Sequence, residues 1–320
     1  MTLLRFGPDT LRASRFGLSP LAETLSTLVR LRRAGGGRAI DPQVRELRTW
    51  LKRDPFADGL LQLVAATKYL PDFVAIPPVG METRIEDELA AMSSIDDQAA
   101  RETLAIAQRF AWASDGLAWA EVDHVTGRAA EAFARGWAQF VQPDWPRRRA
   151  IMERDIHYRV GTIAVDGWRQ ALDGMSRGLH WVAPDIIQFS TQTHPDRLIG
   201  DDGLVFVPHT GPHGQWTCEA PPRFALVYPA RGVLADHGPV NRGLARLLGR
   251  GKAALIAELA TPATPSQLAA LLGVSLGTIS SHLASLRDAD VVITHRNGRA
   301  VYYELTPTGQ QLASLIRAIE

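Results

Sequence analysis

The stretch that decides the fold is residues 264–288, TPSQLAALLGVSLGTISSHLASLRD. Thr264 can cap a helix, proline occupies the first helical position, and Gln267 can complete a capping box. Gly273 ends that helix, and Ser275 can cap another helix after a single intervening residue. Two short helices joined by a glycine-containing turn predict a helix-turn-helix.

A hairpin signal follows the second helix. That helix carries apolar residues at helical spacing, which we expect to face a core: Ile279, Leu283 and Leu286. Two β-prone runs, 291–295 and 299–305, flank Arg296-Asn297-Gly298, and Asn-Gly between such runs is the strongest short hairpin signal. A helix containing Leu255 precedes the whole set. This order predicts a winged helix, whose third helix lies in the DNA major groove.

The segment from about Leu247 to Leu312 resembles the ArsR-type winged-helix regulators. The resemblance rests on LGRGKAALIAELA, on Ile279-Ser280-Ser281-His282-Leu283 in the third helix, and on Gly298–Tyr303 in the hairpin. Asp290 departs from the pattern, because the family usually has glycine there. The resemblance implies a transcriptional regulator that binds double-stranded operator DNA, and we expect a homodimer.

The expected DNA-binding residues lie on the outward face of the third helix and in the hairpin. They are Ser275, Thr278, Ser280, Ser281, His282, Ser285, Arg296, Asn297 and Arg299. On the helix these are short hydroxyls and one imidazole, so bidentate base contacts are lacking and one monomer should read sequence weakly. Specificity would come from dimerisation, DNA shape and the hairpin arginines. The alternative for the serines is capping and simple solvation.

Length and charge indicate two domains. The 320 residues exceed one ordinary domain, and we place the boundary between 1–240 and 241–320. Residues 241–320 carry eight Lys/Arg and five Asp/Glu, or 8 − 5 = +3, whereas the remainder carries 27 − 29 = −2. All eight tryptophans precede residue 217. Six in the helical part could line a binding chamber or fill a core.

Residues 1–240 read as an α+β domain, mostly helical with a small antiparallel sheet. Helices are expected over 19–33, from Asp41-Pro42, near Gly59–Tyr69 and over most of 82–180, with interruptions near Gly161 and Gly167. Strands are expected at Ile186–Thr191, Leu204–Pro208, Gln215–Cys218 and Phe224–Tyr228. SPLAE (19–23) and VYPARG (227–232) resemble a large uncharacterised domain attached to some ArsR-type regulators, and this resemblance implies no activity.

Metal and catalytic sites are not expected. A single cysteine, Cys218, excludes a thiolate pair, and His209 and His213 lie in a Gly/Pro loop whose spacing fixes no shared face. Asp155, His157 and Arg159 are close in sequence, but helix neighbours two apart point away from each other. The Asp123-His124 pair could serve the same chemistry, but no nucleotide-binding or nucleophile motif is present. We therefore expect no enzyme, no metal and no cofactor.

The sequence thus predicts a cytoplasmic, effector-responsive transcriptional regulator that does not sense metal. The N-terminal domain would bind a small-molecule effector, with Gly238–Leu248 as the route to the DNA-binding domain. The first alternative is an N-terminal domain for dimerisation or partner contacts without a ligand, and the second is an enzyme fused to a DNA-binding domain. We expect no secretion signal or membrane contact, since no 18-residue apolar stretch exists. The effector, the operator and the sign of regulation stay open.

Overall fold

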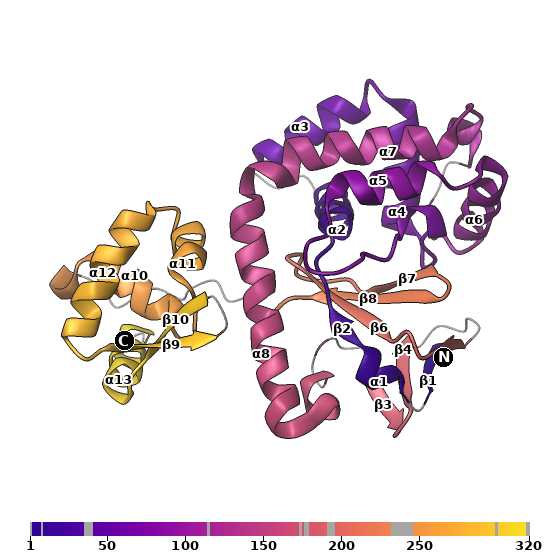
Figure 1. Cartoon of the computed structure of the whole chain (residues 1–320). Helices are drawn as coiled ribbons and strands as arrows, with labels where there is room; N and C mark the ends of the chain where they lie inside the picture. Colours follow the sequence, from indigo (N-terminus) through magenta and orange to yellow (C-terminus); the bar gives the residue numbers. More distant parts are fainter. Residues whose placement is uncertain are drawn as a thin grey trace. The chain divides into compact units, whose positions relative to one another are not determined.

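The chain forms two compact units in a computed structural model (Figure 1). The first unit is Met1–Asp144 with Val165–Ala230, and the second is Trp145–Ala164 with Arg231–Glu320. The structure describes residues 2–7, 9–34, 41–113, 116–172, 175, 179–190, 196–231, 246–297 and 300–317. The second unit therefore includes a segment from the middle of the chain, which the expected boundary at residue 240 left in the N-terminal domain.

The first unit contains two four-stranded sheets. In the order β3-β4-β1-β5 the strands are His180–Ala183, Ile186–Ser190, Thr2–Phe6 and Arg197–Ile199. In the order β2-β6-β8-β7 they are Arg15–Phe16, Leu204–His209, Arg223–Pro229 and Trp216–Ala220. The predicted α+β class is confirmed.

The predicted antiparallel direction of the sheet was wrong, because both sheets are mixed. Strand β8 is parallel to β6 and antiparallel to β7, and β1 is antiparallel to β4 but parallel to β5. The β7–β8 hairpin places β8, not β7, beside β6. Local alternation along a strand does not encode which strand becomes its neighbour, and the prediction also missed β1, β2, β3 and β5.

Helices make up the rest of the first unit. They are α1 (Thr10–Ala13), α2 (Pro20–Arg33), α3 (Pro42–Leu51), α4 (Pro55–Ala66), α5 (Ile85–Ser93), α6 (Asp97–Arg109) and α7 (Val125–Gly136). Short turns are η1 (Asp72–Val74), η2 (Ala118–Ala120), the π-helical η3 (Trp137–Val141) and η4 (Gln142–Asp144). Helix α2 begins as predicted, since Ser19 accepts a hydrogen bond from the amide of Ala22. Helix α4 begins before the predicted Gly59, because Asp54 caps it through Ala57.

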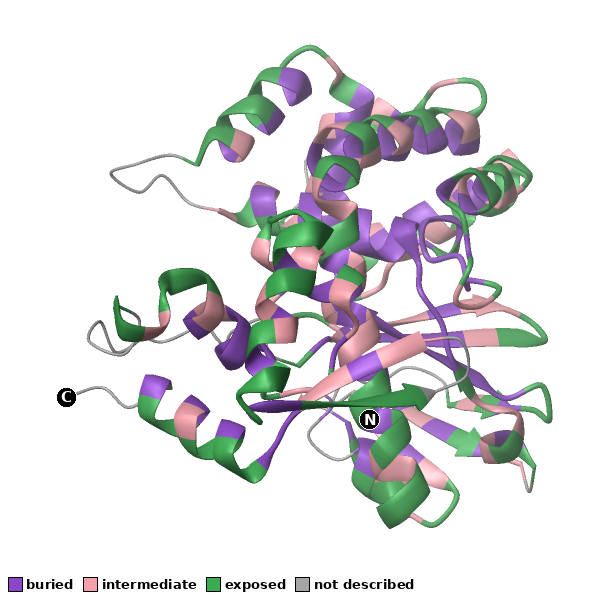
Figure 2. Cartoon of the chain, turned by 60° about the vertical axis from the view of Figure 1, so that its left-hand side comes forward, coloured by how far each residue is buried: buried purple, intermediate pink, exposed green. Residues whose placement is uncertain are grey.

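Helix α2 packs on the second sheet and is buried along most of its length. Figure 2 shows the buried residues of the chain in purple. Ala22 joins an apolar cluster with β6, β7 and β8, formed by Ala75, Val205, Val207, Cys218, Ala225 and Val227. The sheet strands therefore bury one face under α2, and this contact accounts for the apolar character of both segments.

Helix α8 (Trp145–Leu172) continues from one unit into the other. Its backbone leaves helical geometry at Gly167, where φ is 82° and ψ is 175°, and a glycine adopts such a positive φ without steric cost. The interruption expected near Gly161 was wrong, since a lone glycine is tolerated inside a helix at modest cost. The division between units falls between Ala164 and Val165.

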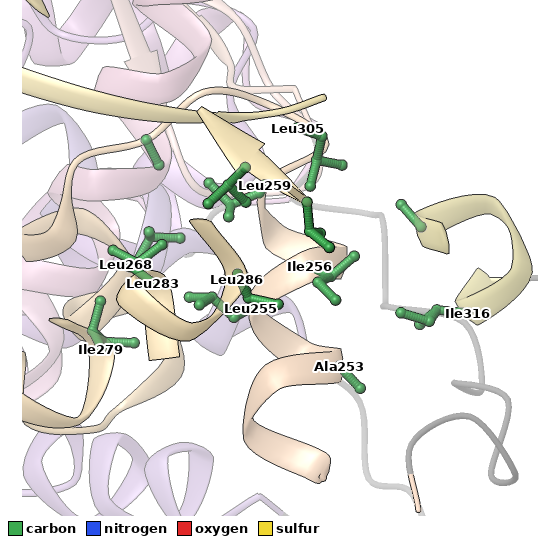
Figure 3. Packing of buried hydrophobic residues seen from close by; sticks show 14 residues of the cluster. Ala253, Leu255, Ile256, Leu259, Leu268, Ile279, Leu283, Leu286, Leu305 and Ile316 are labelled. Atoms are coloured by element: carbon green, nitrogen blue, oxygen red, sulfur yellow. The ribbon is translucent and has the colours of Figure 1, made fainter. Parts of the chain in front are cut away.

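The C-terminal part of the second unit contains the predicted elements in the predicted order. They are α10 (Arg250–Glu258), α11 (Pro265–Leu272), α12 (Leu276–Asp288), β9 (Val292–Asn297), β10 (Ala300–Leu305) and α13 (Pro307–Arg317). Their shared core includes Leu255, Leu268, Ile279, Leu283 and Leu286, whose side chains gather between the helices (Figure 3). Among the described residues no single helix is long and apolar enough to cross a membrane; α11 and α12 meet that criterion only as a pair bent by 116°.

Candidate nucleic-acid interface

Two capped helices form the centre of the candidate interface. Thr264 Oγ1 accepts from the amide of Gln267, whose side chain accepts from the amide of Thr264, so the predicted capping box is present. Gly273 ends α11 in the left-handed region at φ 66°, and Ser275 caps α12 through the amide of Thr278. The bend of 116° between the two helices is close to the crossing typical of a helix-turn-helix.

Helix α12 separates apolar from polar residues along its length. Ile279, Leu283 and Leu286 are buried in the core of the second unit, as the spacing predicted. The expected DNA-binding hydroxyls are exposed, and they are Ser275, Thr278, Ser280, Ser281 and Ser285. His282 is half-buried at the edge of this outward face. Short donors and acceptors on an exposed helix of this kind can approach base edges in the major groove.

The N-terminal turn of α10 lies against this face. Lys252 Nζ donates to Ser285 Oγ at 3.0 Å. A Cβ at Gly251 would lie 2.7 Å from His282 Nε2, so glycine permits the close approach of α10 to α12. Arg250 is exposed on the same turn. The sequence analysis used Arg250 and Lys252 only in the net charge of residues 241–320. Their position at the start of the helix that precedes the helix-turn-helix would have indicated a place in the interface.

The hairpin of β9 and β10 adds one exposed cation to the described surface. Arg296 pairs in register with Val301, and its side chain is exposed. Beside it, His295 stacks on Tyr302 with ring centroids 5.6 Å apart. Asn297 belongs to β9 by its backbone, but its side chain and Arg299 lie outside the described residues.

Asp290 occupies the position at which the ArsR family usually has glycine. Its φ is 54°, in the left-handed region, between the end of α12 and β9. Its carbonyl accepts from Thr306 Oγ1 at 2.7 Å. A side chain in this region costs free energy that glycine avoids, although aspartate tolerates it better than most residues. The departure in sequence therefore keeps the backbone turn and adds local strain.

The N-terminal half of α8 packs within the same unit through a buried ion pair. Arg154 Nη1 lies 2.6 Å from Glu258 Oε2, and its Nη2 donates to the Glu258 carbonyl at 2.6 Å. The Glu258 side chain is only 5% exposed, so the ion pair lies largely out of contact with water. Glu153 accepts a further hydrogen bond from Gln267 at 3.0 Å, at the start of α11.

Asp155, His157 and Arg159, which the sequence places close together, have different partners in the structure. Asp155 and Arg159 form a buried ion pair at 3.0 Å, and Asp155 also accepts from the amide of Arg231. His157 instead contacts Tyr302 of β10, with Nε2 and Oη 2.5 Å apart. Burial raises the Tyr302 pKa, with a further contribution from Glu153. The structure does not bring Asp155 and His157 together as an acid–imidazole pair.

His209 is a buried link in the first unit. Its Nδ1 lies 2.9 Å from Ser26 Oγ and accepts from the amide of Gly211, which leaves Nε2 to donate to the Gly214 carbonyl at 3.0 Å. Burial lowers the His209 pKa, so the neutral ring is favoured. Next to it Thr210 donates twice to Glu23 of α2. Through Nδ1 His209 joins the end of β6 to α2, and through Nε2 it holds the loop that follows β6.

Tryptophans of the helical part pack against other aromatic rings. Trp119 meets Phe56 edge-on at 5.4 Å between centroids, and Trp168 lies 5.5 Å from Phe206. Trp112 is 60% exposed. Trp119 and Trp168 are half-buried, and the exposed Trp112 lies beside the Arg33 guanidinium, 5.7 Å from the centroid of its ring.

Comparison with known families fits this geometry. Residues 255–294 match the family model described as "Bacterial regulatory protein, arsR family". The chain carries an ArsR-family helix-turn-helix domain. The match covers α11 and α12 and does not extend into the N-terminal region. No curated protein and no solved structure matched significantly. An ArsR-family domain indicates a DNA-binding transcriptional regulator.

Proposed function

We propose that the protein is an effector-responsive transcriptional regulator that binds operator DNA in the cytoplasm as a homodimer. The observation that carries the proposal is the division of α12 into a buried apolar face and an exposed polar face flanked by Lys252. The outward face would enter the major groove, while Lys252 and Arg296 would contact phosphates on either side.

Dimerisation would use the terminal helix of the ArsR-family domain. Helix α13 buries Ala313 and Ile316 but leaves Leu315 56% exposed. A groove of about 510 Å³ lies beside it, lined by residues that include Leu259, Pro262 and Leu305. An exposed leucine on a helix that borders a groove supports pairing with a second copy. Sedimentation of Leu315→Asp at micromolar concentration tests this: a dimer that persists would remove α13 from the interface.

We further propose that the protein neither senses metal nor catalyses a reaction. The lone cysteine supports the first statement: Cys218 is buried, and burial raises its thiol pKa, so the thiolate that binds metal is disfavoured. Within the described ranges, no cluster of three or more His, Cys, Asp or Glu residues could hold an ion. Operator affinity should therefore be unchanged by zinc, nickel, arsenite or a chelator.

The test of DNA binding uses the full chain. Sequencing genomic fragments retained by the protein should show enrichment of a small set of sites. Lys252→Ala with Arg296→Ala should weaken binding to operator and unrelated duplex alike, and reduce the slope of log affinity against log salt by about 0.9 per lost phosphate contact. Arg84→Ala is the matched control, since Arg84 is an exposed arginine of the first unit. Equal retention of all fragments at every salt concentration would contradict the proposal.

A further inference from the structure

A groove in the first unit is bordered by α3 and by the end of α7 with the π-helical turn η3. Its volume is about 460 Å³, and its lining includes Arg45, Glu46, Trp50, Arg53, Arg135 and Gln139. The volume lies in the range of small-molecule sites in proteins.

The lining carries an excess of positive charge. Three guanidinium groups face a single carboxylate, that of Glu46. Glu46 Oε1 accepts from Gln139 Nε2 at 2.6 Å, so an amide rather than an arginine holds this carboxylate. In the part of the chain that the structure describes, Arg45, Arg53 and Arg135 have no ion-pair partner. A groove with three uncompensated guanidinium groups favours an anionic occupant.

The floor of the groove holds one guanidinium in place. Trp50 is 2% exposed, and its ring stacks on Phe140 with centroids 6.4 Å apart. Its Nε1 donates to Asp54 at 3.3 Å. The Arg135 guanidinium carbon lies 4.9 Å from the centroid of the Trp50 ring. A cation held over a fixed indole loses little side-chain freedom when an anion binds it.

The π-helical turn η3 contributes a polar side chain to the lining of the groove. Gln139 lies within Trp137–Val141, where the chain adopts a π-helix directly after α7. Such turns are rare and frequently occur at functional sites. Gln139 brings an amide from this turn to the groove, and Thr49 of α3 adds a hydroxyl. The Gln139 amide keeps a second N–H that can hydrogen-bond an anion oxygen, whereas the Thr49 hydroxyl already donates to the Arg45 carbonyl at 2.9 Å.

We propose that this groove binds a small organic anion with at least two carboxylate or phosphate groups. Bidentate guanidinium contacts suit both kinds of oxyanion. A nucleic acid strand fits less well, because Trp50 is covered and offers no face on which a base could stack. The proposal rests on the proposed function in one respect, since it assigns the effector to this groove.

The experiment measures binding of citrate and of inorganic pyrophosphate to the full chain by calorimetry, with glycerol as the uncharged control. Both anions are tested because the guanidinium set does not distinguish carboxylate from phosphate. We expect at least one of them to bind, and Arg45→Gln with Arg53→Gln to weaken its binding at least about tenfold. Arg48→Gln is the matched control, because Arg48 lies on α3, is exposed and does not line the groove. Tryptophan fluorescence provides a second readout of anion binding. The anion should quench the emission of the parent chain, and this quenching should be absent in Trp50→Phe.

The outcomes separate the site from the regulatory role. Failure of both anions to bind the parent chain, or equal binding by the double variant, overturns the groove as an anion site. Loss of DNA affinity in the double variant, without any anion binding by the parent, would assign the groove to nucleic acid instead and also overturn it. An anion that binds the groove but leaves operator affinity unchanged supports the site and contradicts the proposed effector response.

Discussion

Tyr302 Oη donates a hydrogen bond to His157 Nε2 at a distance of 2.5 Å. The direction follows from the other ring nitrogen, because Nδ1 lies 2.7 Å from the Glu153 carbonyl and must donate to it. Tyr302 belongs to the hairpin and His157 to α8. The second unit therefore joins two segments that lie 145 residues apart in sequence.

The first prediction concerns this hydrogen bond. Tyr302→Phe should lower the free energy of unfolding of the second unit by about 1 kcal/mol, because the buried Tyr302 loses its hydrogen bond to the exposed His157. Urea unfolding of Tyr302→Phe, His157→Ala and the double variant gives the coupling energy directly. Tyr303→Phe is the control, since the Tyr303 hydroxyl forms no hydrogen bond with the residues that the structure describes. Strictly additive effects of the two changes would show that the contact contributes nothing.

The second prediction concerns the contribution of α8 to the C-terminal unit. A fragment of residues 241–320 lacks Arg154 and so loses its ion pair with Glu258, and we expect the fragment to be less stable than the unit that contains α8. Adding a peptide of residues 145–164 should raise the denaturation midpoint of the fragment, and the same peptide with Arg154→Ala should raise it less. A fragment that is unaffected by either peptide would show that the ArsR-family domain is stable alone.

The third prediction concerns Asp290. Asp290→Gly should stabilise the second unit by about 1 kcal/mol, since glycine removes the steric cost of a side chain at a φ of 54°. Asp288→Gly, at the last position of α12, is the matched control and should destabilise it, because glycine weakens a helix. Thermal melts of the two variants should move in opposite directions. A lower melting temperature for Asp290→Gly would mean that the aspartate makes a compensating interaction.

The fourth prediction concerns pH and Glu88 of α5. Burial raises the pKa of Glu88 to about 8, although Ser19 and the amide of Leu21 donate hydrogen bonds to it. The folded state therefore binds a proton that the unfolded state releases near its ordinary carboxyl pKa of about 4.5. Stability should fall as pH rises between these two values and level off above about 8.

Glu88→Gln tests that linkage. The amide stays neutral at every pH, so the melting temperature of the variant should decline less than that of the parent between about pH 5 and pH 8. The neighbouring Asp87→Asn serves as the control, because Asp87 is an exposed residue of the same helix turn. If the melting temperatures of the parent and of Glu88→Gln change with pH in parallel, Glu88 is not the cause of the pH dependence.

Local patterns allowed the helix-turn-helix to be predicted closely. Thr264, Gly273 and Ser275 act within one turn of the groups they bond, so their roles can be read from spacing alone. The burial of Ile279 and Leu283 follows from helical periodicity for the same reason. The exposed face of α12 then follows by exclusion.

Long-range contacts escaped prediction for the opposite reason. Strand β1 pairs with β4 across more than half of the chain, and neither strand carries a local mark of its partner. Lys252 reaches Ser285 only after two helices have folded against each other. The association of α8 with the ArsR-family domain includes the ion pair of Arg154 and Glu258, two charged residues that sequence alone would assign to the solvent.

The interrupted second unit has a consequence for synthesis on the ribosome. Arg154 precedes Glu258 by 104 residues, and translation at roughly 5–20 residues per second separates their emergence by about 5–20 s. During that interval the first half of α8 leaves the ribosome without the partners that cover it in the finished protein. The nascent chain can complete the second unit only when α10 and the elements after it have emerged. A ribosome that stalls before α10 therefore leaves Arg154 and the first half of α8 without the residues that pack on them.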